Sequence, residues 1–461
     1  MPPAQPDHGV PTQLGSAPLG PTPLGSAPLG PTPRQSGVGD PELMVPSHPT
    51  APAHPAAPRR PSEDWRIIVA IFWVTSMVEG LGVSQIFNFV PAYLKEMGVM
   101  EADRLRFIGV FGALIFVVGA PFVPLWGVWA DKYSRKAVIV RSALVEAVVF
   151  AGVALSREPW QLALSMMLVG LQLGNTGVML AAIRDVTPKH RLGTVIALFG
   201  ASSPIGFAVG STLGGIISDG LHLGLPMIFW VSCGLSIGTA LLVTLGSREI
   251  RPEVVPEGKV ITLAFGAIRA VLSDRATVRI FAIFGVAFLG SQMARPFVPV
   301  LVEGVNGGSP NLASAIALVT GTAALVGALV SPAGGWLGDR IGFRPVLVGA
   351  LVGAGGALVV EPLMPSVPLL ALSVLVFAAC TAAVSAMVFS LLATEIPPER
   401  RSTTLNLVYL PLYAAGIVGP ALGAVVVNVG LPAPFWLGAA IYFVGAAVLA
   451  TRRPHPVAVP A

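Results

Sequence analysis

Long apolar stretches divide this chain from residue 66 almost to its C-terminus. Each stretch holds about 20 residues with few charges, and short polar segments separate them. A helix of that length crosses the hydrocarbon core of a bilayer, where lipid offers the backbone no hydrogen-bond partner, so each stretch is predicted to be a transmembrane helix. The pattern predicts twelve spans, at residues 66–93, 107–130, 137–156, 161–183, 194–218, 226–246, 279–302, 312–334, 345–361, 367–393, 404–428 and 432–451.

The composition excludes an ordinary soluble protein. Hydrophobic residues make up 54% of the 461 and charged residues 11%, against about 25% charged residues in a soluble domain. Both cysteines, Cys233 and Cys380, fall in predicted spans, so neither a disulfide framework nor a metal site is expected. The histidines lack metal-ligand spacing, and no glycine-rich nucleotide loop is found, so neither an enzyme nor a cofactor is indicated.

Residues 1–64 differ from the rest of the chain. They are rich in Pro, Gly, Ala and Ser, and the decapeptide LGSAPLGPTP at 14–23 is repeated at 24–33. Such a segment buries too little apolar surface to offset its ordering entropy, so a disordered cytoplasmic tail is predicted. It also lacks the features of a cleaved signal peptide. A linker is the simplest interpretation, and a proline-rich docking segment is the alternative.

The basic residues predict the orientation. Of the 28 Lys and Arg residues, 22 lie in the N-terminal tail or in segments on the same side of the membrane. Positively charged loops stay in the cytoplasm, so both termini are predicted to be cytoplasmic. This distribution also explains the net charge of +5 without a nucleic-acid partner. The opposite side carries Lys95, Arg104, Arg106 and Arg157.

The chain also repeats itself. Pro124, Gly127 and Asp131 recur as Pro332, Gly335 and Asp339, a shift of 208 positions, and the run Phe89–Pro91 recurs with the same shift. An even number of spans separates the copies, so the halves are parallel and related by an axis along the membrane normal. The predicted parts are a tail (1–64), a first six-helix bundle (65–246), a cytoplasmic central loop (247–278), a second bundle (279–453) and a C-terminal tail (454–461).

Two charged loops carry a family resemblance. They resemble the loop motif of the major facilitator superfamily, with Ser134 where the family usually has glycine, and the matching residues are Gly127, Asp131, Arg135 and Lys136, then Gly335, Asp339, Arg340 and Arg344. The resemblance covers residues 66–451. It implies two six-helix bundles around a central substrate cavity that opens alternately to either side. The charged loops would form a cytoplasmic gate that favours the outward-open state. The alternative is a set of solvated topology charges.

The branch of the family is suggested by span 5. Gly206, Gly210 and Gly214 are similar to the glycine-rich helix-5 motif of proton-coupled drug antiporters, with Ser211 where that motif has proline. Those antiporters also carry an arginine early in helix 4, where this chain has Gly170. The resemblance implies export of a hydrophobic or amphipathic small molecule against protons, by a monomer in the inner membrane. A sugar or metabolite porter or importer of the same fold stays open, as does a non-transporting scaffold.

Ionisable residues inside spans are costly and therefore functional candidates. Glu79, about midway along span 1, is the first candidate for binding the transported proton, and Glu146 on span 3 is the second. Arg295 on span 7 is expected to face Glu79 across the cavity. Arg141 is expected to have a structural role by bonding the first charged loop, and Glu361 is expected at the membrane interface.

Polar residues at helical spacing are the candidates for the cavity wall. They are Gln85, Asn88, Gln172, Asn175, Gln292, Arg295, Tyr409 and Tyr413. Hydrogen bonding between helices without substrate contact is the alternative interpretation of these residues.

Overall fold

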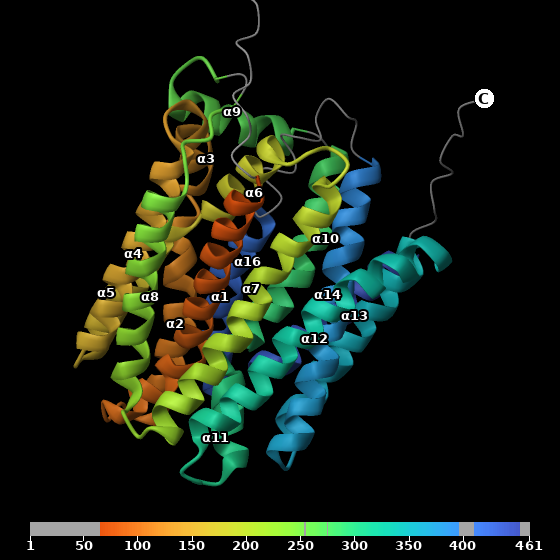
Figure 1. Cartoon of the computed structure of the whole chain (residues 1–461). Helices are drawn as coiled ribbons and strands as arrows, with labels where there is room; N and C mark the ends of the chain where they lie inside the picture. Colours follow the sequence, from red (N-terminus) through yellow and green to blue (C-terminus); the bar gives the residue numbers. More distant parts are fainter. Residues whose placement is uncertain (1–64, 253–254, 274, 396–409, 452–461) are drawn as a thin grey trace, which may run out of the picture. The chain divides into compact units, whose positions relative to one another are not determined.

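The computed structural model describes residues 65–451 apart from 253–254, 274 and 396–409. Within these residues every regular element is a helix, and twelve segments are long and apolar enough to cross a membrane (Figure 1). The predicted all-α membrane fold with twelve spans is therefore confirmed. The predicted tails, 1–64 and 454–461, lie outside the described residues.

The first six spans form one bundle. Its elements are α1 (Trp65–Glu96), α2 (Glu101–Gly119) with α3 (Val123–Lys132), α4 (Arg135–Leu155), α5 (Pro159–Val169) with η1 (Gly170–Gln172) and α6 (Asn175–Val186), α7 (Leu192–Gly215) with η2 (Ile216–Gly220), and α8 (Leu225–Gly246). Spans 2 and 4 are interrupted. Span 4 breaks at Gly174, whose φ of 95° lies in the left-handed region that favours glycine.

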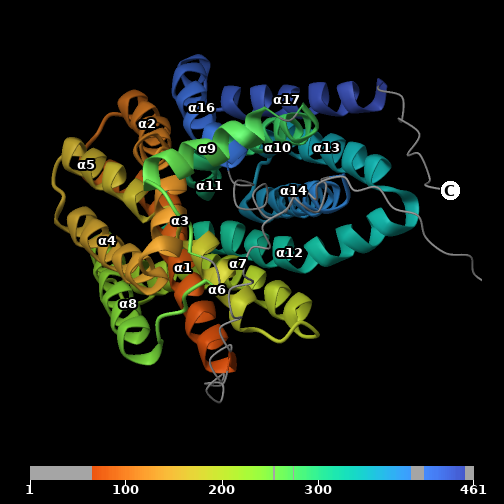
Figure 2. The same ribbon diagram turned by 90° about the horizontal axis from the view of Figure 1, so that it is seen from above.

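The last six spans form the second bundle. Its elements are α10 (Arg275–Ala294) with η3 (Arg295–Phe297) and α11 (Val298–Asn306), α12 (Leu312–Ile341), α13 (Phe343–Val360) with η4 (Glu361–Leu363), α14 (Val367–Glu395), α16 (Leu410–Val426) with η5 (Val427–Val429), and α17 (Ala433–Thr451). Span 7 is interrupted at Pro296, whose ring removes a backbone donor from the helix. Figure 2 shows the two groups of helices side by side.

The two bundles meet along two helix pairs. α7 packs on α12, and α2 packs on α16. α1 contacts both η3 and α11 of the second bundle. The segment between the bundles, which the sequence predicts as a loop, contains a further helix, α9 (Val260–Leu272). This helix contacts α3 and α10 and crosses one end of the molecule (Figure 2).

Glycine allows α1 and α7 to approach closely. A Cβ atom added to Gly206 on α7 would lie 1.9 Å from the carbonyl oxygen of Met77, and one added to Gly80 on α1 would lie 2.2 Å from that of Ser203. Side chains larger than hydrogen do not fit at these positions. Small residues at such contacts are the usual means by which membrane helices pack tightly.

Candidate functional site

The two ends of the molecule are chemically different. We call the end with the charged loops 127–136 and 335–344 the motif end, and the opposite end, where α11 lies, the Glu303 end (Figure 1). The polar residues singled out in the sequence lie between these ends or at them.

A polar cluster surrounds Glu79 within the first bundle. The Asn175 side-chain amide, at the start of α6, donates a hydrogen bond to the Glu79 carboxylate on α1. Arg141 and Ser142 on α4 also interact with this carboxylate. The Oδ1 atom of Asn175 is buried and has no hydrogen-bond partner. Spans 3 and 4 thus bring donors and a positive charge to one partly exposed carboxylate on span 1.

Arg141 lies differently from the prediction. Its guanidinium carbon is 3.7 Å from the centre of the Trp126 ring, and its three side-chain nitrogens are buried without a hydrogen-bond partner. The expected bond to the first charged loop is therefore wrong. α4 turns Arg141 inward toward α1, where it interacts with Glu79. The sequence placed this charge on span 3 but gave no information on which neighbouring span it would face.

Glu146 lies one to two turns further along α4 and is 2% exposed. It interacts with Ser236 on α8, with Gln172 on η1 and electrostatically with Glu79. Its carboxylate also packs against Gly82 of α1, because a Cβ atom there would lie within 2.4 Å of a Glu146 oxygen. Two carboxyl groups, Glu79 and Glu146, therefore share the interior of the first bundle. Gln172 and Asn175 contact this pair from span 4.

Gln85 and Asn88 point in different directions from α1. Gln85 is fully buried and accepts a hydrogen bond from Ser232 of α8, inside the first bundle. Asn88 joins the two bundles: its side-chain amide donates to Ser211 Oγ on α7 at 2.8 Å and to Thr320 Oγ1 on α12 at 3.0 Å. We call Asn88, Ser211 and Thr320 the bridging layer.

Arg295 does not face Glu79, so that prediction is wrong. Its guanidinium carbon lies 4.5 Å from the centre of the Phe87 ring and 5.3 Å from that of Phe207. The reason lies in the repeat itself. Residue 295 is shifted by 208 from residue 87, and the two spans meet at equivalent positions. Glu79 precedes Phe87 by eight residues, about 12 Å along a helix.

The remaining cavity candidates lie at the contact between the bundles or outside the described residues. Gln292 is 4% exposed and faces Gly419 of α16. Tyr413 on α16 packs its ring 6.2 Å from that of Phe116 on α2. Tyr409 lies outside the described residues. Glu361, expected at the interface, is 2% exposed, because η4 continues α13 and keeps its side chain within the bundle; both carboxylate oxygens lack a hydrogen-bond partner.

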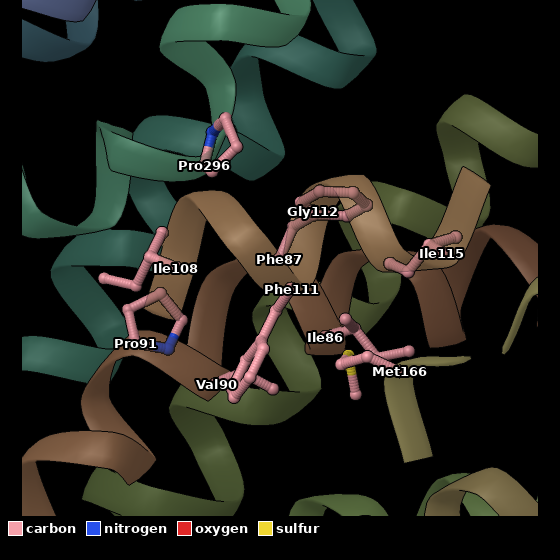
Figure 3. A pocket seen from close by; sticks show the side chains of 10 residues that line it. All are labelled: Ile86, Phe87, Val90, Pro91, Ile108, Phe111, Gly112, Ile115, Met166 and Pro296. Atoms are coloured by element: carbon pink, nitrogen blue, oxygen red, sulfur yellow. The ribbon is translucent and has the colours of Figure 1, made fainter. Parts of the chain in front are cut away.

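A small apolar cavity adjoins Arg295. It lies between α1, α2, α5 and η3 and has a volume of about 20 Å³, roughly the space of one water molecule. Figure 3 shows Pro296 on one side of it and Val90, Phe111 and Met166 on the other. In this conformation the cavity is too small for a drug-sized molecule.

The charged loop of the first bundle forms a dense network. Arg135, 3% exposed, pairs with Asp131 at 2.8 Å and with Asp185 at the end of α6 at 2.7 Å. Glu249, which follows α8, accepts hydrogen bonds from Ser134 and from the backbone nitrogen of Arg135 at 2.8 Å. The Glu249 carboxylate lies at the first turn of α4, where the positive end of the helix dipole also stabilises a negative charge. The sequence prediction did not include Glu249 or Asp185 as site residues.

The second charged loop is arranged differently. Arg344 donates to the carbonyl oxygen of Leu449, at the end of α17, and the Arg340 guanidinium lies 4.3 Å from the centre of the Trp336 ring. Asp339 and Arg344, the counterparts of residues in the first charged loop, form no ion pair with each other among the described residues. Glu395, the counterpart of Asp185 in the second half, is the last residue of α14, and the segment that follows it, 396–409, lies outside the described residues. Gly127 and Gly335 have open space where a Cβ atom would be, and Lys136 binds the carbonyl oxygens of Thr244 and Ser247.

Charged residues also join the bundles at the Glu303 end. Glu303 on α11 pairs with Lys95 of α1 at 2.6 Å and with Arg104 of α2 at 2.9 Å. Lys95 and Glu303 are again related by the shift of 208, so the pair lies where the repeat-related ends of spans 1 and 7 meet. Arg106 donates to Asn428, and Asp219 accepts from the backbone nitrogen of Ser314. At the motif end, Arg135, Lys136 and Arg344 form hydrogen bonds within their own bundles, and Lys132 donates to the linker.

Comparison with known proteins agrees with this architecture. The sequence profile of the Major Facilitator Superfamily matches residues 72–313 and again 280–461. Two parallel six-helix bundles that share polar groups buried at membrane depth define a multi-pass membrane transporter. The chain belongs to the Major Facilitator Superfamily.

Individual members of this superfamily are similar to the chain in sequence or in fold. The chain is 27% identical over 389 residues to the multidrug resistance protein MdtG of Proteus mirabilis, an alignment that covers 83% of this chain and 94% of that protein. Among solved structures, the human organic anion transporter MFSD10 shares the fold with a TM-score of 0.62 at 18% identity, covering 84% of this chain and all of the other. A mutant of the nucleoside transporter NupG has a TM-score of 0.70 at 15% identity, covering 83% and 99%.

Proposed function

We propose that this transporter exports hydrophobic or amphipathic small molecules from the cytoplasm in exchange for protons. The observation that carries this proposal is Glu79, a carboxylate within the first bundle that is held by Asn175 and approached by Arg141. A carboxylate at membrane depth is costly and is retained where it binds protons or substrate. The similarity to a protein named for multidrug resistance, over nearly the whole length of that protein, supports export.

The proposed mechanism is alternating access. A proton on Glu79 removes its negative charge and weakens its interaction with Arg141. Transport is coupled if the protonated protein and the substrate-loaded protein can change between the two conformations. The empty, unprotonated protein must not make this change. The difference in free energy between the two bundle arrangements must therefore depend on what is bound.

The conformation described here fits the cytoplasm-facing state in this scheme. The bundles are joined at the Glu303 end and by the bridging layer, whereas the charged network of Asp131 and Arg135 closes within one bundle. We place the protein in the inner membrane. With the predicted orientation, the motif end then faces the cytoplasm. The predicted gate would then form in the opposite state, in which the two charged loops at the motif end approach each other.

The test is transport in liposomes with an imposed pH gradient. Purified wild-type protein is compared with Glu79→Gln, using lipophilic cations, aromatic anions and sugars as probes. We expect the gradient to drive accumulation in the wild type. In the variant it should have no effect, while exchange of labelled for unlabelled substrate continues, because the amide keeps the shape of the carboxyl group but binds no transported proton.

The matched control is Glu101→Gln, which removes an exposed carboxylate at the start of α2. This variant should transport as the wild type does. If the gradient has no effect on the wild type, proton exchange is wrong and a metabolite facilitator of the same fold replaces it. If Glu79→Gln keeps gradient-driven accumulation, the proton is bound elsewhere, and Glu146 becomes the next residue to replace.

A further inference from the structure

Arg295 is a positive charge at the centre of the molecule without an acidic partner among the described residues. It lies in η3, where Pro296 interrupts span 7, and its side chain reaches Phe87 of α1 and Phe207 of α7. The second bundle thereby places a guanidinium between two aromatic rings of the first. The side chain is partly exposed, and it lies close to the bridging layer, since Asn88 follows Phe87 directly.

The rings hold this guanidinium without occupying its hydrogen-bond donors. The guanidinium group is planar and its five N–H donors lie in that plane, so an aromatic ring over one face leaves the donors free. None of the hydrogen bonds found within the described residues involves the Arg295 side chain, whose contacts there are with the rings of Phe87 and Phe207. A planar donor edge that is fixed in orientation and unpaired is what a carboxylate or phosphate binds in a bidentate manner.

We infer that Arg295 binds the anionic group of the transported molecule, so that the preferred substrates are amphipathic anions with an aromatic or apolar body. This inference rests on the proposed function and specifies its substrate class. Phe87 and Phe207 supply apolar contact next to the charge, and Asn88, Ser211 and Thr320 supply neutral polar groups nearby. A lipophilic cation would meet the positive charge of Arg295 and bind less well.

The inference changes the charge carried in each cycle. Export of one anion in exchange for one imported proton moves two positive charges inward, so a membrane potential that is negative inside drives the exchange. Export of a monovalent cation for one proton moves no net charge. Dependence on membrane potential therefore separates the two substrate classes independently of the effect of any substitution.

The experiment uses full-length protein in liposomes and two probes, 9-anthroate as an aromatic anion and tetraphenylphosphonium as a lipophilic cation. The variants are Arg295→Gln and Arg295→Lys. The control is Arg66→Gln, which removes an exposed arginine that also lies over an aromatic ring, Trp65 at 5.7 Å, but at the motif end of α1. Transport is measured with a pH gradient, with and without an imposed membrane potential.

We expect the wild type to transport anthroate with an initial rate that rises with membrane potential. In Arg295→Gln the KM for anthroate should increase about 10- to 100-fold, the loss expected for a charged hydrogen-bonded pair. Arg295→Lys should show an intermediate KM, because the charge remains but the planar fork is lost. Arg66→Gln should match the wild type. Transport of tetraphenylphosphonium should be unchanged or faster in Arg295→Gln, which also shows that the variant is folded.

Two results would overturn the inference. The first is an unchanged KM for anthroate in Arg295→Gln, and the second is gradient-driven transport of tetraphenylphosphonium without transport of anthroate. In this second case the proposed proton-coupled export stands, and only the substrate class is wrong. If the pH gradient moves neither probe and no sugar in the wild type, the proposed function itself fails.

Discussion

At the scale of single residues, several charged side chains of this transporter have partners from other spans, whereas Arg295 and Glu361 form no hydrogen bond or ion pair among the described residues. Glu79 accepts a hydrogen bond from Asn175, and Arg135 pairs with two aspartates. Inside a bilayer a charge without a partner is expensive, so a charge that the packing of helices leaves unpaired is a functional candidate. The positions of the charges are visible in the sequence, whereas the identity of the partners depends on how the spans are rotated against each other.

Arg135 should be important for stability. Replacement by Gln leaves Asp131 and Asp185 without their shared positive charge, at a cost of about 1.5–3 kcal/mol for hydrogen bonds to charged groups. We expect a lower midpoint of thermal unfolding in detergent. The control is Arg184→Gln: Arg184 also contacts Asp185, at 3.5 Å, but is 52% exposed, so its loss should change the midpoint little. Equal midpoints for both variants would contradict the structural role of the Arg135 network.

At the scale of helices, glycine positions decide how closely the spans pack. Gly206→Val should destabilise the contact between α1 and α7, because the new side chain would overlap the backbone of Met77. Overpacking of this kind costs about 1–3 kcal/mol. The measurement is again the thermal midpoint in detergent. Gly200→Val is the control on the same helix, since a Cβ atom there meets nothing within 4 Å. A loss of stability that is equal in both variants would reflect the helix itself and not the contact.

α9 shows what the pattern of spans leaves out. The sequence predicts the segment 247–278 as a loop because it is too polar to cross the membrane. The structure forms a helix in which Ala264 is buried while Ile261 and Phe265 are exposed. A short amphipathic helix carries a weaker signal than a span of about 20 apolar residues, and its contacts with α3 and α10 depend on the assembled bundles.

At the scale of the whole molecule, the repeat brings equivalent positions of spans 1 and 7 together. Phe87 lies against Arg295 and Lys95 pairs with Glu303, each pair separated by 208 positions. Identical residues at such meeting points would place like charges or equal bulk against each other. At these two pairs of positions the halves have different residues, and the contact at the Glu303 end becomes an ion pair between bundles.

Glu303→Gln should favour opening of the Glu303 end. It removes the negative charge shared by Lys95 and the buried Arg104, and a loss of about 1.4 kcal/mol would change the ratio of open to closed molecules about tenfold. The measurement is the distance between spin labels at Met100 and Val429, two exposed residues of opposite bundles, with Cys233 and Cys380 replaced by Ala. We expect a larger population at long distance in the variant.

The control for this measurement is Asp103→Asn. Asp103 pairs with Arg106 within α2 at the same end, so its loss removes an acid without separating the bundles. Its distance distribution should resemble that of the wild type. An unchanged distribution in Glu303→Gln would show that helix packing alone keeps this end closed.

By itself, the sequence determined the class and the framework of this protein: the twelve spans, the two halves and the charged loops. These features are local or repeat at a fixed shift, since a run of apolar residues requires a spanning helix wherever it lies. It also located Glu79, Glu146 and Arg295. The tertiary structure alone decided their partners, turning Arg141 toward Glu79, placing Arg295 on Phe87 and bringing Glu303 to Arg104. The physical reason is that a rotation or axial shift of one helix changes every neighbour of a side chain, while the apolar pattern that defines the span stays the same.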